Sequence, residues 1–447
     1  MKNRREFLMA LLAAGAGLAA CGSAERLPSV PVSTAQGDTS PDMPPPTEPA
    51  PTDAAPAEGG ARPVARGEIS PALVNANNRF GLKLFANLRE ADAAGNVFIS
   101  PASVAIALAM TYNGAGGETQ QAMARALELN GLSLDEVNQS YAALLQTLAT
   151  ADPKVTLSIA NSLWGRQDVA FRQDFLARVR LFYEAEVSAL DFSDPATVDI
   201  INAWVNEKTN RKISRILDRI SDDAILFLIN AIYFKGAWVK AFDPQATREQ
   251  PFILLDGSQK PVSMMSRSGE FRHLRGADFQ AVSLPFGAPD AEGRFSMYVF
   301  LPDESSSLDA LAARLTAEQW AAWMAQFAPA EGFLAMPRYT LEYEAGLNNA
   351  LSALGMGVAF DPQQADFSLM VDLRPENVFI SSVRHKTFIE VNEEGAEAAA
   401  VTSVEMGVTS AREEPERFTM IVERPFLVAI RDDRSGAVLF IGAIVAP

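Results

Sequence analysis

Residues 385–402, HKTFIEVNEEGAEAAAVT, lead into a stretch that alternates strictly from Gly395 onward. One set of side chains is small or apolar, and it consists of Ala396, Ala398, Ala400, Thr402, Val404, Met406 and Val408. The other set carries both charges of the stretch, and it consists of Glu397, Ala399, Val401, Ser403, Glu405 and Gly407. A strand that is buried on one face requires this period-two pattern. The pattern therefore predicts that residues 396–408 can pair within a β-sheet.

The residues that follow the alternating stretch predict an exposed loop. Residues 409–417, TSAREEPER, are polar and charged. A strand-like segment that leads directly into such a loop is typical of a chain with two states, one with the segment mobile and one with it paired in a sheet. An ordinary strand followed by a long turn is the alternative interpretation, and this segment alone favours neither.

Apolar runs elsewhere in the chain predict further strands. Three such runs cover residues 231–234, 297–301 and 388–391. The chain ends in two more, residues 426–430 and 437–445, and the polar turn between them predicts a hairpin. The nearly continuous hydrophobicity of these last two runs indicates strands that are covered on both faces.

Two helices are predicted near the start of the globular region. Apolar residues recur at helical spacing from Leu73 to Leu88. After a short strand at 96–99, Ser100 and Pro101 predict the N-cap and first turn of a helix to about residue 112. That helix is apolar nearly all round, so it should be buried. Because we find no internal repeat and no second linker, the sequence predicts one mixed α+β domain over residues 69–447.

The N-terminus predicts an export signal. Arg4 and Arg5 resemble a twin-arginine motif, and the apolar run 7–20 is too short to span a bilayer. The run ends in Leu-Ala-Ala before Cys21, which resembles a bacterial lipobox. The resemblance implies that residues 1–20 are a signal peptide and that Cys21 carries the lipid. The alternative is a plain secretory signal with Cys21 near the cleavage site by chance.

Residues 21–68 predict a disordered tether. They are rich in Pro, Ala, Ser and Thr and contain no aromatic residue. Such a stretch buries too little apolar surface to offset the entropy lost on ordering. We therefore expect an exported, membrane-anchored lipoprotein that faces the periplasm or the cell exterior.

The bulk composition excludes several classes of protein. A net charge of −17 argues against binding nucleic acid, because nothing in the chain could neutralise a run of phosphates. Cys21 is the only cysteine, so the globular region contains no disulfide. The two histidines, His273 and His385, are too few for a His-rich metal site. A metal site formed by carboxylates alone remains an alternative. We expect no cofactor and no metal.

Several blocks of the sequence together resemble the serpin family. They occur in family order and cover essentially the whole chain from residue 71: residues 96–127, 230–244, 336–368, 385–402 and 423–447. The resemblance implies a single α+β domain. It would have a large central β-sheet, further sheets, eight or nine helices and an exposed reactive-centre loop.

The resemblance also implies a function and a partner. The chain would be a suicide-substrate inhibitor of a serine protease, or of a cysteine protease, and would not be an enzyme. We expect a monomer that forms a covalent complex with its target. The family spacing from Gly395 gives Thr409–Ser410 as the reactive bond, and Thr409 after Val408 favours an elastase-like or subtilisin-like target. Cleavage after Arg412 is the competing choice and would imply a trypsin-like target.

The resemblance assigns roles to two further groups of residues. The loop hinge comprises Glu393, Glu394, Gly395, Ala396, Glu397, Ala398, Ala399, Ala400 and Thr402. The regions beneath the sheet and at the point of loop insertion, known as shutter and breach, comprise Ser100, Ser103, Asn230, Trp238 and His385. Without the resemblance, the polar residues would be interpreted as separate helix caps or satisfied backbone partners. Trp238 could equally be a core residue, and Glu393 with Glu394 a solvated acidic pair.

Two other functions compete with inhibition. A hydrolase with a catalytic triad is disfavoured, because we find no Gly-x-Ser-x-Gly motif and only two histidines that could act as a base. A non-inhibitory serpin that serves as a surface binding or structural lipoprotein is the second alternative. The alanines of the hinge argue against it, because bulky or charged residues there would slow insertion of the loop.

Overall fold

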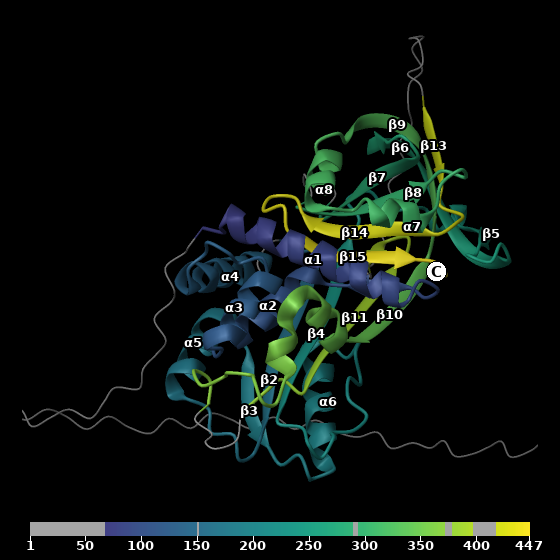
Figure 1. The fold of residues 1–447 in the computed structure, drawn as a ribbon. Coiled ribbons are helices and arrows are strands. Elements are labelled where there is room, and N and C mark those ends of the chain that lie inside the picture. The colour runs from purple at the N-terminus through teal and green to yellow at the C-terminus, as the bar shows by residue number, and fades with distance from the viewer. Residues whose placement is uncertain (1–67, 150–151, 289–293, 372–377, 397–416) are drawn as a thin grey trace, which may run out of the picture. The chain divides into compact units, whose positions relative to one another are not determined.

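The computed structural model of the protein describes residues 68–149, 152–288, 294–371, 378–396 and 417–447 (Figure 1). The predicted signal peptide and tether, with Cys21, lie outside the described residues. The same is true of most of the alternating stretch and of the loop after it: Glu397, Ala398, Ala399, Ala400, Thr402, Thr409, Ser410 and Arg412.

The described residues form helices and strands in a mixed order. The helices are α1 (Pro71–Ala91), α2 (Pro101–Tyr112), α3 (Gly117–Ala126), α4 (Leu134–Ala149), α5 (Gln173–Tyr183), α6 (Ala196–Lys208), α7 (Leu308–Ala313), α8 (Ala317–Met324) and α9 (Asn348–Leu351). The strands are β1 (Val97–Ile99), β2 (Val155–Arg166), β3 (Glu186–Leu190), β4 (Leu226–Ala237), β5 (Arg248–Ile253), β6 (Gln259–Arg275), β7 (Phe279–Phe286), β8 (Phe295–Pro302), β9 (Ala328–Pro337), β10 (Tyr339–Gly346), β11 (Ser382–Val391), β12 (Gly395–Ala396), β13 (Phe418–Ile421), β14 (Phe426–Asp432) and β15 (Val438–Ile444). This α+β content, with nine α-helices in the described part, agrees with the predicted fold class.

The strands form two sheets. The larger has nine strands in the order β1-β15-β14-β8-β7-β6-β9-β13, with β5 paired to β6. The smaller has the order β10-β11-β4-β2-β3, and β12 also pairs with β4. The long strand β6 lies in the larger sheet with β5, β7 and β9 as its neighbours, so it joins the two halves of that sheet.

The predicted helix α2 connects the two sheets. Every residue of α2 is buried, and the helix contacts β15 of the larger sheet and β4 of the smaller one (Figure 1). The Ser100 hydroxyl accepts the amide hydrogen of Ser103 at 3.3 Å, and Pro101 occupies the first turn, as the sequence predicted. A helix that is apolar all round must be buried on every side, and its position between the two sheets provides this burial.

The smaller sheet is covered on both faces. Alternate residues of β4, namely Leu226, Leu228, Ile232 and Phe234, belong to the main core with α2. The residues between them, Phe227, Ile229 and Ala231, pack with Ile201 and Val205 of α6 in a second core. Alternate residues of β4 face opposite cores because side chains alternate between the two faces of a strand. The same alternation would decide which side chains of a strand added beside β4 face each core.

The predicted C-terminal hairpin is confirmed as β14 and β15, which pair antiparallel. Its turn is held by Asp432, which is fully buried and accepts two hydrogen bonds from Arg294 at 2.8 Å. Burial alone would raise the pKa of Asp432, but Arg294 and Ser435 hold it below its ordinary value. The pair anchors the turn to the start of β8.

Neither a membrane-spanning helix nor a metal-binding cluster is found in the described part of the chain. No helix in that part of the chain is long and apolar enough to cross a membrane. Within the same part, no group of three or more His, Cys, Asp or Glu side chains is placed to hold a metal ion.

Candidate functional site

In the smaller sheet, β11 pairs with only part of β4, and the end of β4 has no β11 residue paired with it. Strands β11 and β4 pair in parallel from Ser382–Phe227 to Phe388–Tyr233. After that point the chain turns back at residues 392–395, and β12 pairs antiparallel with Gly236 and Ala237 at the end of β4. The start of the alternating stretch therefore already pairs with β4, and β12 also contacts β11.

The turn before β12 depends on Asn392 and Gly395. The Asn392 side-chain oxygen accepts the amide hydrogens of Glu394 at 3.0 Å and Gly395 at 3.2 Å. Gly395 has φ of +137°, a backbone conformation that L-residues rarely adopt. A Cβ atom there would lie 2.7 Å from Ala237 Cα and 2.8 Å from the Trp238 nitrogen. Only glycine fits this position without moving β12 away from β4.

Trp238 binds the turn directly. Its indole Nε1 donates to the Asn392 carbonyl at 2.9 Å, and its backbone nitrogen donates to the Glu394 carbonyl at 2.9 Å. Its ring stacks on Phe286 with centroids 4.3 Å apart. Trp238 is thus buried like a core residue and also holds the first residues of the hinge.

Glu393 is buried beside Trp238, so it is not part of a solvated acidic pair. Its carboxylate accepts from the Thr247 hydroxyl at 2.7 Å and lies 3.6 Å from Arg338. Its carbonyl accepts the Phe242 amide hydrogen at 2.8 Å. The hinge therefore begins with a residue that is fixed through both its side chain and its backbone.

A second group of polar residues lies about the middle of β4. In the strand register, Asn230 of β4 is opposite Asn161 of β2 on one side and His385 of β11 on the other. Ser100 and Ser103, at the start of α2, are within hydrogen-bond distance of this row. All five residues are buried, and we call them the polar cluster: Ser100, Ser103, Asn161, Asn230 and His385.

The hydrogen bonds of the polar cluster link α2 to three strands. The Asn230 side-chain amide donates to the Ser103 hydroxyl and carbonyl and, at 2.6 Å, to the Asn161 oxygen. The Ser100 backbone nitrogen donates to His385 Nε2 at 3.0 Å. The Ser100 hydroxyl donates to the Leu439 carbonyl of β15 at 2.6 Å. The interpretation of these groups as unrelated caps is therefore wrong.

The contacts of His385 fix its protonation state. Nε2 accepts a hydrogen from Ser100, so the proton of the neutral ring lies on Nδ1, which donates to the Asn230 oxygen. Complete burial lowers the pKa of His385 to about 3. Both ring nitrogens are occupied in this arrangement, so His385 is not available as a general base.

The sequence analysis missed two residues at this site. Asn161 lies in the buried second half of β2, and Thr387 of β11 donates from its hydroxyl to the Phe98 carbonyl at 2.7 Å. A polar residue in the middle of a buried strand was the available signal for both. Trp238, which the resemblance assigns with Glu393 to the region where the loop enters, lies apart from this cluster, eight residues beyond Asn230 along the chain, or about 26 Å in an extended strand.

Comparisons with known proteins agree with this arrangement. The sequence model of the serpin (serine protease inhibitor) family matches residues 75–447. Human Serpin B8 is 37% identical over 383 residues, which are 84% of this chain and 99% of that protein. Human leukocyte elastase inhibitor is 34% identical over 388 residues, which are 84% and 99% of the two chains.

Solved structures are similar over the same region. The native state of the thermophilic serpin tengpin has a TM-score of 0.79 and 32% identity, and covers 87% of this chain and 97% of its own. Human thyroxine-binding globulin has a TM-score of 0.76 but 24% identity, so it supports the fold alone. From the family match and these relatives, the chain belongs to the serpin family.

Proposed function

We propose that the protein inhibits a protease as a suicide substrate, by inserting its cleaved loop between β4 and β11. The observation that carries this proposal is the pairing of β12 with residues 236–237 at the end of β4. These residues lie just beyond residues 227–233, which pair with β11. A strand that starts there can extend only by separating β11 from β4. The relatives named leukocyte elastase inhibitor support an inhibitory role.

The register of β12 specifies how the inserted strand would lie. Gly395 is opposite Ala237 and Ala396 is opposite Gly236. Continued along β4, this register would bring Ala398 opposite Phe234 and Ala400 opposite Ile232. Directly opposite residues share a face of the sheet, so the small and apolar set would face the main core with α2.

Two residues of the other set, Glu397 and Val401, would lie opposite residues of β4 that suit them. The same register brings Glu397 opposite the half-buried Lys235, which is an opposite-charge pair. It brings Val401 opposite Ala231, on the face that α6 covers. The strand would end with Met406 opposite Leu226, the first residue of β4. Glu397 and the small side chains of the stretch therefore suit insertion in this register, whereas Glu405 would lie opposite the buried Phe227.

The chemistry of inhibition is supplied by the target protease. Its nucleophile attacks the Thr409 carbonyl carbon, the Thr409–Ser410 peptide bond breaks, and the new Ser410 amine takes up a proton and leaves. The resulting ester, or thioester for a cysteine protease, normally reacts with water. Insertion of the upstream segment carries the attached protease along β4 before that second step. Distortion of the protease active site then preserves the covalent complex.

The polar cluster opposes insertion in the intact protein. It links β2, β4 and β11 to α2 at the level of Asn230, where Thr402 would lie in the inserted state. Separation of β11 from β4 breaks the contact between Asn230 and His385. We infer that the cluster keeps the sheet closed until the loop has been cleaved.

The same fold is compatible with a non-inhibitory function. Thyroxine-binding globulin shares the fold at 24% identity, so the fold alone does not decide between a surface binding lipoprotein and an inhibitor. The composition of the hinge favours inhibition, because its alanines can enter the sheet without burying bulk or charge.

We also propose that the protein is exported and held to a bacterial membrane by a lipid on Cys21. The lipobox-like sequence before Cys21 and the Pro-rich tether after it support this proposal. The chain's formal charge of −17 would not attract it to an anionic membrane surface, so the lipid would provide the attachment.

The variants Ala398→Arg and Ala400→Arg should convert the inhibitor into a substrate. Each would bury an unpaired guanidinium in the main core on insertion, which costs several kcal/mol. Incubation with an elastase-like and a subtilisin-like protease should give an SDS-resistant complex for the parent protein. For the two variants, cleavage should continue while the yield of complex falls by about tenfold or more.

The matched control is Glu397→Gln, which adds neither charge nor bulk and would lie opposite the half-buried Lys235. It should retain most of the complex. A parent protein that is cleaved by every protease without any complex would favour the non-inhibitory function. Full yields from the Ala398→Arg and Ala400→Arg variants would contradict the register derived from β12.

Cleavage is expected between Thr409 and Ser410. Thr409 is three residues beyond Met406, so the attached protease would be carried just past the end of β4. Mass spectrometry of the C-terminal fragment released from the denatured complex should give a peptide that begins at Ser410. A peptide beginning at Glu413 would instead place the cut after Arg412 and imply a trypsin-like target.

His385 should make the protein less stable in acid. Its pKa is about 3 in the folded chain and near 6.5 in the unfolded chain, so between these values the unfolded chain binds the extra proton. The free energy of unfolding should fall by about 2 kcal/mol from pH 8 to pH 5 through this residue. Urea unfolding at each pH should show that His385→Gln lacks this part of the slope. The control His273→Gln should keep it, and parallel curves for the parent and His385→Gln would exclude the assignment.

The variant Cys21→Ser should release the protein from the membrane. Expression in a bacterium with radiolabelled palmitate should label the parent protein and the control Ser23→Ala but not Cys21→Ser. The parent should also partition into the detergent phase of Triton X-114. An unlabelled parent protein in the culture medium would support the plain secretory signal.

A further inference from the structure

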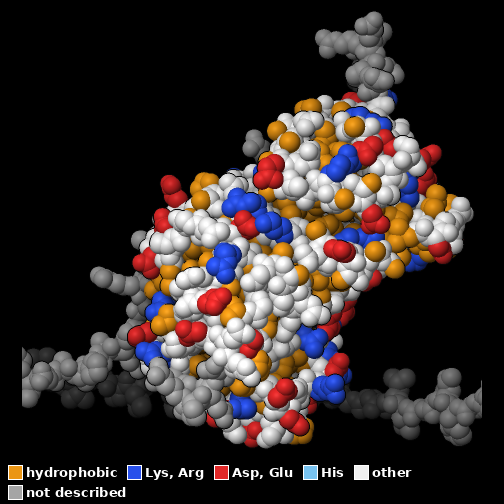
Figure 2. All heavy atoms as spheres, viewed as in Figure 1, with side chains coloured by type: hydrophobic (Ala, Val, Ile, Leu, Met, Phe, Trp, Pro, Cys, Tyr) orange, Lys and Arg blue, Asp and Glu red, His pale blue; other side chains and the backbone are white. Residues whose placement is uncertain are grey.

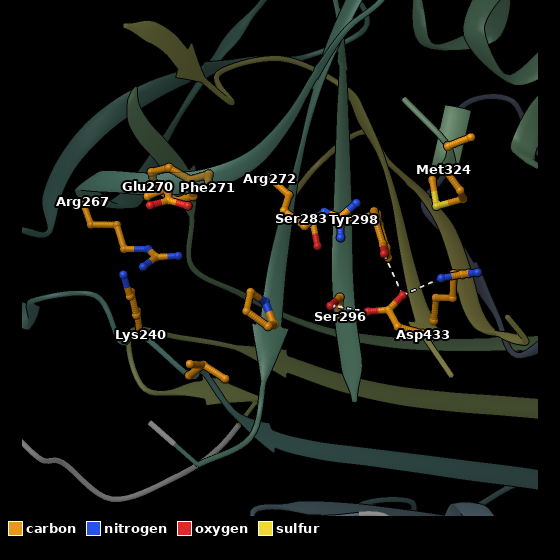
Figure 3. A pocket seen from close by; sticks show the side chains of 14 residues that line it. Lys240, Arg267, Glu270, Phe271, Arg272, Ser283, Ser296, Tyr298, Met324 and Asp433 are labelled. Atoms are coloured by element: carbon orange, nitrogen blue, oxygen red, sulfur yellow. Dashed lines mark hydrogen bonds and ion pairs between the residues drawn. The ribbon is translucent and has the colours of Figure 1, made fainter. Parts of the chain in front are cut away.

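A cavity of about 600 Å³ lies over the larger sheet, apart from the hinge and the polar cluster. Its floor consists of β6, β7 and β8, and its rim includes the end of α8, the turn after β14 and residues 239–240 after β4 (Figure 3). Cavities of 300–1,000 Å³ commonly hold organic ligands of drug-like size. A small inorganic ion would leave most of this volume unoccupied.

Arg267 lines one end of the cavity without a counter-ion. Among the described residues, its guanidinium makes no hydrogen bond or ion pair, and its Nε atom is buried without a partner. It lies over the rings of Phe242 and Phe271, 5.3 and 4.5 Å from the two ring centroids. These rings orient the guanidinium and leave its N–H groups unsatisfied. Burial lowers the pKa of Arg267 to about 10, so it is still charged at neutral pH.

A second cation faces Arg267. Figure 3 shows the side chains of Lys240 and Arg267 pointing toward one another, although like charges repel. Lys240 is exposed and makes no ion pair within the described part of the chain. Two cations in this arrangement suit an anion that lies between them and accepts from both.

Within the described residues, neither acidic side chain of the cavity forms an ion pair with Arg267 or Lys240. Asp433 lies at the other end and accepts from Ser296 at 2.6 Å, Tyr298 at 2.7 Å and Arg431 at 2.6 Å (Figure 3). Glu270 is exposed, and no ion pair joins it to Arg267 within the described residues. The lining carries four cationic and two acidic side chains, a local excess of +2 in a chain of net charge −17.

The remaining walls are apolar. Between the two charged ends, the cavity is lined by Val239, Phe271, Pro285, the ring of Tyr298 and Met324. Apolar walls with a few convergent polar groups are typical of sites for organic ligands. Positive charge at one end and an apolar surface beside it suit a ligand that has both an anionic group and an apolar body.

We propose that this cavity binds an organic anion, with its carboxylate or sulfonate group between Arg267 and Lys240 and its apolar body against Phe271, Pro285 and Met324. The proposal does not depend on the inhibitory function, since no residue of the hinge or of the polar cluster lines the cavity.

The test uses two fluorescent probes that differ in charge. 8-Anilinonaphthalene-1-sulfonate has the aromatic body and the anionic group, whereas N-phenyl-1-naphthylamine has nearly the same body and is neutral. We expect Arg267→Met to weaken binding of the sulfonate by about 10- to 100-fold, because charge-assisted hydrogen bonds are lost. Binding of the neutral probe should change little. Inorganic phosphate at equal concentration should not displace the sulfonate.

Two further variants keep the test decisive. Lys240→Met removes an exposed cation, so it should fold normally even if Arg267→Met does not, and it should weaken sulfonate binding severalfold. Arg125→Met, on the exposed face of α3, removes an equal charge away from the cavity and should have no effect. Unchanged sulfonate binding in Lys240→Met and Arg267→Met would overturn the proposal. So would an equal loss of both probes, or displacement of the sulfonate by phosphate.

Discussion

The backbone of β4 can pair with only one neighbour on its β11 side, and the proposed insertion of the loop depends on this constraint. From Phe227 to Tyr233 that neighbour is β11, in a parallel ladder, and at Gly236 and Ala237 it is β12, in an antiparallel one. Extension of β12 must therefore separate β11 from β4. Antiparallel pairs are slightly more stable per residue than parallel ones, so the exchange of partners also improves the ladder along β4.

The contacts at the end of β4, where β12 pairs, differ from those at the middle of the strand. At the open end, Trp238, Asn392 and Glu393 hold the turn so that Gly395 can approach the backbone of Ala237 closely. At the middle of β4, Asn161, Asn230 and His385 form a buried row across three strands, in which Asn230 and His385 also hydrogen-bond the start of α2. A buried polar network that is fully satisfied stabilises one arrangement, and it costs energy as soon as one partner moves away. The same residues thus stabilise the closed sheet and resist its opening.

The two cores that cover the smaller sheet explain the composition of the hinge. The face of β4 toward α2 is lined by large apolar residues, so a strand added beside it must present small side chains there. The face toward α6 ends near Lys235, where a charge can stay near water. In the proposed inserted state, Ala398 and Ala400 would suit the first environment and Glu397 the second.

The sequence alone determined the features that depend on near neighbours in the chain. These are the cap of α2 at Ser100 and the hairpin of β14 and β15. Each follows from spacing or capping within about twenty residues. The polar cluster was predicted only through the family resemblance and without Asn161, and the cavity at Arg267 was not predicted at all. Residues 161, 230 and 385 are far apart in the chain, and only the strand register places them side by side. Likewise, an arginine in a sequence does not show whether an acid will lie beside it. That depends on which strands and helices fold against it, which is decided by the tertiary structure.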